Sequence, residues 1–82
     1  MKNLPLLRLI HSDETLENGI ARFSLMFWRT QSTKSIVESL QIGRIEPLKV
    51  KSDGRIFNGN VRCKVLIERD FDINILEREV ID

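Results

Sequence analysis

The chain has 82 residues, of which 13 are basic and 12 acidic, so its formal net charge at pH 7 is +1. This length suits a single domain over residues 1–82, and the small net charge excludes a global field that would steer the protein to nucleic acid or acidic lipid. One cysteine excludes an intramolecular disulfide, and one cysteine with one histidine falls short of a structural zinc set, so we expect no metal site and a reducing, cytoplasmic compartment.

The sequence pattern of residues 1–19 gives the weakest indication of secondary structure, and we treat them as an N-terminal extension of undefined structure. The opening MKNLPLLRLI has the outline of a signal peptide, but Asn3, Pro5 and Arg8 interrupt its apolar run, so we assign it to the mature chain. Its apolar residues favour a short strand over 4–10. No stretch of the sequence approaches the roughly 18 apolar residues that cross a membrane, so no membrane partner is expected.

Two periodicities compete after the turn dipeptide Asn18-Gly19. Positions 16, 20, 23 and 27 share one face of a helix, whereas Phe23, Leu25 and Phe27 alternate as in a strand. Because glycine inside a helix costs about 1 kcal/mol relative to alanine, we favour a strand over residues 23–27. Its aromatic residues are interpreted as core rather than as a platform for stacking bases. Trp28 suits either the core or a dimer contact.

The next segment carries a helix pattern. Hydroxyl side chains at residues 30–33 can cap a helix, and Ile36, Val37 and Leu40 follow at helical spacing before Gly43. The pattern predicts a short helix over residues 33–42.

A hairpin and a second helix follow in the sequence. Alternating residues in PLKVKS, from residue 47, lead to the turn dipeptide Asp53-Gly54, after which Ile56-Phe57 returns as a second strand. We expect Asn60 to cap a helix over residues 61–70, with Lys64 on its outer side. A terminal edge strand is expected around Val80 and Ile81.

Arg62 stands out because it follows the predicted cap by two residues. A cation in the first turn of a helix is unfavourable by about 0.3–1 kcal/mol when exposed, and a bound anion would reverse that sign. Gly59 would let a ligand approach the main chain, the amides of residues 61–63 would point at it, and Arg62 would clamp phosphate or carboxylate oxygens. The alternative is a strand-to-helix junction that binds nothing, because G-x-x-R is too short to be specific.

The segment IGRIEPLKVKSDGRIFNGNVRCKVLIERDFDIN, residues 42–74, resembles the ParB/sulfiredoxin superfamily. Members of that superfamily run through a helix, a glycine, a "PI-V" strand, a DG turn and a G-[EN]-x-R junction. The likeness extends over about residues 28–82. The matching residues here are Gly43, Pro47, Leu48, Val50, Asp53, Gly54, Gly59, Asn60 and Arg62.

The resemblance implies a small α+β domain, with a short mixed sheet and two to three helices. It also implies contacts to nucleotide phosphates by Gly59, Asn60 and Arg62, with a nucleotide as ligand, alone or with magnesium. Asp53 and Arg55, in the matched turn, complete the set of candidate binding residues.

The chain departs from the pattern within the junction. Partition proteins carry a glutamate and two arginines after the glycine, where this chain has Asn60, Val61 and Arg62. Sulfiredoxin has its catalytic cysteine at the position of Asn60, whereas Cys63 lies three residues later and is interpreted as a core side chain. Related kinases need a carboxylate that accepts a hydroxyl proton, and Glu46 is the nearby candidate.

Contact with a DNA backbone is a further expectation, with two alternatives. Several basic residues could form a local surface that touches phosphates without reading bases, or they could be ordinary solvated side chains. The residues concerned are Lys49, Lys51, Arg55, Arg62 and Lys64.

Three functions therefore stay open. The favoured one is a binding or regulatory module, linked to DNA maintenance, that takes a phosphate-bearing ligand at Gly59–Arg62 and is not an enzyme. The others are a small phosphotransferase or nuclease-like enzyme, and an interaction protein of a toxin-antitoxin or partition system with a vestigial pocket. A homodimer that buries part of the apolar N-terminal region and a monomer are equal alternatives.

Overall fold

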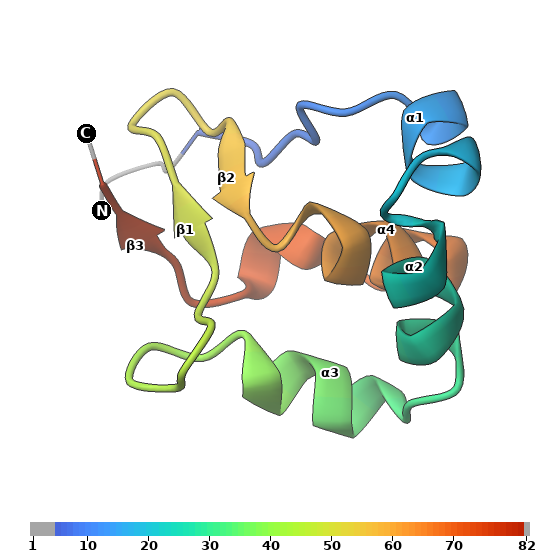
Figure 1. Ribbon diagram of the computed structural model, residues 1–82. Coiled ribbons are helices and arrows are strands. Elements are labelled where there is room, and N and C mark those ends of the chain that lie inside the picture. The colour runs from blue at the N-terminus through green and yellow to red at the C-terminus, as the bar shows by residue number, and fades with distance from the viewer. Residues whose placement is uncertain (1–4, 82) are drawn as a thin grey trace.

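A computed structural model describes residues 5–81, and it shows a small α+β domain with a three-stranded mixed sheet at one end and helices at the other (Figure 1). The predicted fold class is thereby confirmed, although the described residues contain four α-helices rather than two or three. The elements are α1 Asp13–Asn18, α2 Arg22–Arg29, α3 Thr33–Ser39, β1 Lys49–Val50, β2 Ile56–Asn58, α4 Asn60–Glu68, the 3-10 helix η1 Ile73–Ile75 and β3 Glu79–Val80.

The sheet is built on the predicted hairpin. Strands β1 and β2 pair antiparallel, with Val50 opposite Ile56, and β3 pairs parallel with the other edge of β1, which gives the order β2-β1-β3. The hairpin and the terminal edge strand are thus confirmed. The predicted strand over residues 4–10 is wrong in extent: Leu4 lies outside the described residues, and the rest forms a single bridge between Arg8 and Arg55.

The predicted strand over residues 23–27 is wrong, because this segment is the helix α2. Gly19 ends α1 and α2 begins three residues later, so the dipeptide Asn18-Gly19 separates two helices instead of interrupting one. Only Leu25 is buried in α2, whereas Phe23 and Phe27 are 65% and 54% exposed. The interpretation of this aromatic cluster as core is therefore wrong for both phenylalanines.

Helices α3 and α4 confirm two predictions with shifted boundaries. The Ser32 hydroxyl accepts a hydrogen bond from the Ser35 amide and starts α3, which ends at Ser39, three residues before the expected end. Gly59, in the left-handed conformation, occupies the N-cap position of α4 in place of the predicted Asn60. Helix α4 ends at Glu68 instead of residue 70, and Asp70 has a positive φ of 59°.

The core forms around α4, six of whose nine residues are buried. The prediction that Lys64 lies on the outer side is wrong, because its Nζ lies 3.4 Å from Glu68 Oε2 and 3.6 Å from Glu17 Oε1 while its stem is covered. No helix within residues 5–81 is long and apolar enough to span a bilayer. The core residues are Leu7, Leu25, Ile36, Leu40, Leu48, Val50, Ile56, Cys63, Val65, Leu66, Ile73 and Leu76.

The hairpin turn requires glycine for two reasons, which makes Gly54 a test of the fold. Its φ is +95°, and a Cβ there would lie 2.2 Å from the Leu6 carbonyl oxygen. We expect Gly54→Ala to lower the free energy of unfolding by at least about 2 kcal/mol. Gly43→Ala is the control, because its φ is +93° but no atom lies within 4 Å of its added Cβ. The control should cost about 1 kcal/mol in urea unfolding, and equal losses would contradict the clash.

Candidate functional site

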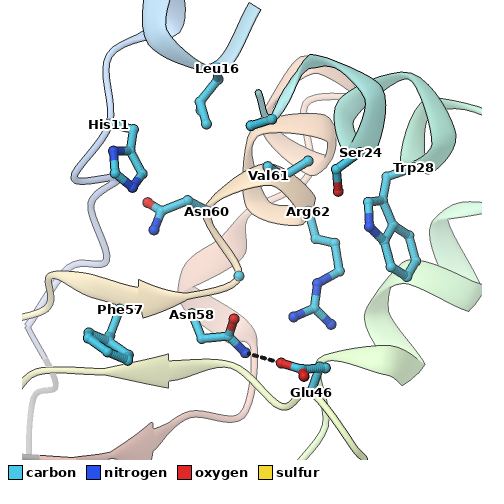
Figure 2. A pocket seen from close by; sticks show the side chains of 12 residues that line it. His11, Leu16, Ser24, Trp28, Glu46, Phe57, Asn58, Asn60, Val61 and Arg62 are labelled. Carbon is cyan, nitrogen blue, oxygen red and sulfur yellow. Dashed lines mark hydrogen bonds between the residues drawn. The ribbon is translucent and has the colours of Figure 1, made fainter. Parts of the chain in front are cut away.

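A pocket of about 350 Å³ opens between α2 and the junction of β2 with α4 (Figure 2). The junction supplies residues 58–62, α2 supplies Ser24 and Trp28, and the loop before β1 supplies Glu46. His11 and Phe57 complete its polar and aromatic lining. The structure thus places four of the six predicted site residues, Glu46, Gly59, Asn60 and Arg62, around one hollow.

Arg62 is the buried cation of this pocket, with 6% of its surface exposed. Its Nη1 donates hydrogen bonds to the carbonyl oxygen of Ser39, at 3.2 Å, and to the Ser39 hydroxyl, at 3.1 Å. Its guanidinium carbon lies 5.4 Å from the centroid of the Trp28 ring. Within residues 5–81 Arg62 forms no ion pair with a carboxylate.

The position of Arg62 explains how a cation is accommodated in the first turn of α4. Ser39 is the last residue of α3, so the guanidinium caps a terminal carbonyl at the negative end of that helix dipole. With Gly59 as N-cap, Arg62 is also the third helical residue of α4 and not the second. Burial lowers the pKa of Arg62, yet an arginine in a protein keeps its proton at pH 7.

Gly59 is required by packing of the core. Its φ is +116°, and a Cβ there would lie 3.0 Å from Leu48 Cδ1 and 3.2 Å from Leu40 Cδ2. Contact with two leucines thus gives this glycine a structural role, while the approach of a ligand to its main chain stays a prediction.

Asn60 uses its side chain to join distant parts of the chain. It is 7% exposed, its Oδ1 accepts from the Ile10 amide at 3.0 Å, and its Nδ2 donates to the Ile56 carbonyl at 2.9 Å. Both ends of its side-chain amide are thus held by the protein.

The backbone amides of α4 fit the prediction only in part. The amide of Cys63 is not available to a ligand, because it donates to the Gly59 carbonyl at 2.9 Å. The amides of residues 60–62 have no acceptor within the helix, as at every helix start. These three, and not residues 61–63, form the polar end of α4 beside the pocket.

Glu46 lies on the pocket wall beside Asn58, the first residue of the junction. Its Oε2 accepts a hydrogen bond from Asn58 Nδ2 at 3.1 Å, and Asn58 Nδ2 also donates to the Pro47 carbonyl at 3.0 Å. Figure 2 shows the Arg62 guanidinium directed toward the side of the pocket that carries Glu46. The pocket therefore combines one buried cation with one exposed carboxylate.

Asp53 and Arg55 lie apart from the pocket, at the hairpin turn. Arg55 Nε lies 2.9 Å from Asp53 Oδ2, the Arg55 amide donates to Asp53 Oδ1 at 3.1 Å, and Arg8 Nη2 lies 3.6 Å from Asp53 Oδ2. The hydrogen bond from the Arg55 amide lowers the pKa of Asp53. These two predicted site residues stabilise a turn, and the structure does not bring them to Arg62.

The residues of the expected basic surface lie in separate parts of the structure. Lys51 and Arg55 line a small hollow beside Phe57, with Lys51 Nζ 5.5 Å from the centroid of that ring, while Arg62 is in the pocket and Lys64 is buried beside two glutamates.

The described residues hold no group of three or more metal-ligating side chains. Sequence reasoning missed His11, Ser24 and Asn58 as pocket residues, because nothing in their spacing marks them.

Cys63 lies in the core, as predicted, with no exposed surface. Burial raises the pKa of its thiol to about 12. Because the thiolate is the reactive form, we expect the folded protein at pH 8 to react with iodoacetamide about a thousand-fold more slowly than a free thiol. Mass spectrometry of the labelled protein, with urea-unfolded protein as the control, measures this rate. Equal labelling of the folded and unfolded protein would place the thiol outside the core.

Comparisons of the chain with protein-family models, curated proteins and solved structures found no match. The resemblance to the ParB/sulfiredoxin superfamily therefore stays a prediction drawn from the residues quoted above.

Proposed function

We propose that this protein is a binding module for a phosphate-bearing ligand of mononucleotide size, held in the pocket at the β2–α4 junction. One observation carries the proposal: Arg62 is 94% buried on a pocket wall without a carboxylate partner among the described residues. Burying a cation without an ion pair is costly. The charge of Glu46 in the same pocket lowers that cost in part, although the two side chains form no ion pair, and a bound anion would lower it further.

The donors around Arg62 suit an anion. Both hydrogen bonds that the guanidinium donates come from Nη1, and its remaining nitrogens have no acceptor among residues 5–81. A guanidinium with open donors binds phosphate oxygens through charge-assisted hydrogen bonds. The unpaired amides at the start of α4 add donors and a partial positive charge beside it.

The other pocket residues suit the organic part of a nucleotide. Phe57 is 59% exposed and offers a ring face, and Trp28 forms a second aromatic wall behind Arg62. A volume of about 350 Å³ lies at the small end of the usual range for small-molecule sites, about 300–1,000 Å³. This volume favours a ligand with one base and a short phosphate group over a dinucleotide.

Glu46 supports a second candidate function, a small phosphotransferase. A carboxylate in the same pocket as the phosphate-binding arginine is placed to accept a proton from a hydroxyl nucleophile. In a pure binding module the same carboxylate would only repel the phosphate. The two functions therefore predict opposite effects of neutralising Glu46.

Ligand binding tests the first function. We expect AMP, ADP, ATP or inorganic phosphate, with or without magnesium, to stabilise the protein by about 2.7 kcal/mol at 100 times the dissociation constant. Arg62→Lys keeps the charge but loses the planar donor fork, so calorimetry should show binding about 10–100-fold weaker. Arg44→Lys, an exposed arginine outside this pocket, is the matched control and should bind normally.

Neutralising Glu46 separates the two functions. In a binding module, Glu46→Gln should bind the same ligands as tightly or more tightly, because a repulsive charge is removed. In a phosphotransferase it should abolish transfer of labelled phosphate while leaving binding intact. Flat melting curves for every ligand would contradict both functions and favour an interaction protein.

A further inference from the structure

The outer face of α2 is apolar and unpartnered, although its inner face already packs on the domain. Leu25 is buried against the core, while Ile20, Phe23, Met26 and Phe27 are 98%, 65%, 60% and 54% exposed. On a helical projection Phe23 and Phe27 lie on the side away from Leu25 and Met26 lies on the flank, because each residue advances by about 100°; Ile20 lies in the turn two residues before α2. Exposed apolar side chains that gather in one patch usually mark an interaction surface.

We infer that this outer face, here called the α2 face and defined by Ile20, Phe23, Met26 and Phe27, is the interface of a homodimer. Figure 1 places α2 at the end of the molecule remote from the sheet, where a second copy can approach. In an antiparallel two-fold arrangement, Phe23 of one copy lies opposite Phe27 of the other, with Met26 close to the axis.

The area of the α2 face fits this occupant. With about 150–200 Å² for each large side chain, the exposed fractions of the four residues amount to roughly 400–550 Å² of apolar surface. A standard interface buries about 800 Å² on each partner, of which somewhat more than half is apolar. The α2 face thus supplies the apolar share of a standard dimer interface.

The charges around α2 favour a second copy over a partner chosen by charge. A two-fold interface places each surface against itself, so a patch of one sign would repel its own copy. None of the four residues is charged. Arg22 lies over the Phe23 ring at 4.7 Å, and Arg29 is paired with both Glu17 and Glu68, with its Nη2 2.6 Å from Glu17 Oε1. The cations of α2 are therefore already engaged within one copy.

Sedimentation of charged variants tests the interface. We expect the wild-type protein to be a dimer at high micromolar concentration, and Phe23→Glu or Phe27→Glu to raise its dissociation constant at least about 30-fold. Ile45→Glu is the matched control, because Ile45 is 98% exposed and belongs to another part of the surface, before β1. That control should stay dimeric, and circular dichroism checks that each variant is folded.

Cross-linking decides the question without a destabilising charge. Met26→Cys should be joined to its copy by a short bis-maleimide linker, whereas Ile45→Cys and the wild-type protein, whose Cys63 is buried, should not. A monomeric wild-type protein, a dimer that survives both glutamate variants, or a Met26→Cys protein that does not cross-link would overturn the inference. A monomer that sediments with anionic lipid vesicles would instead assign the α2 face to a membrane surface.

Discussion

The left-handed turn at Gly59 is the constraint on which the rest of the structure depends. It redirects the chain from β2 into α4, and Leu48 and Leu40 pack so closely against it that a larger residue would displace them. The next residue, Asn60, ties this turn to the N-terminal segment and to β2 through two hydrogen bonds. With the start of α4 fixed in this way, Arg62 can project only toward the end of α3 and the pocket.

The parts of the fold that local chemistry determines were predictable from the sequence. The dipeptide Asp53-Gly54 predicted the hairpin, hydroxyl residues before Ile36 predicted α3, and the apolar spacing after Gly59 predicted α4. The prediction failed at α2, because Gly19 was taken as an interruption within one helix, which favoured a strand, whereas Gly19 ends α1 and α2 begins at Arg22. The strand alternation also placed Phe23 and Phe27 in the core with Leu25, although only Leu25 is buried.

The sequence predicted the site residues that lie close together in the chain, but not the contacts that only the fold creates. Gly59, Asn60 and Arg62 belong to one short segment, and the structure places them together with Glu46. Asp53 and Arg55 are as near in sequence, but the hairpin carries them to the far end of β2. Arg62 donates to Ser39, 23 positions away, and Asn60 accepts from the amide of Ile10, 50 positions away, so their roles could not be inferred from spacing. Sequence indicated that Arg62 is unusual, and only the tertiary structure shows that it caps another helix.

The hydrogen bonds from Arg62 Nη1 to Ser39 connect the pocket to the end of α3. A guest held by the open donors of the guanidinium leaves both Nη1 bonds to Ser39 in place, so one side chain would contact the guest and the last turn of α3 at once. Coupling of this kind is thermodynamically reciprocal: a guest that favours this position of the guanidinium also favours this position of the helix end. The chain that follows α3, residues 40–46, leads to Glu46 on the same pocket, so a displacement of α3 would alter the positions of both Arg62 and Glu46.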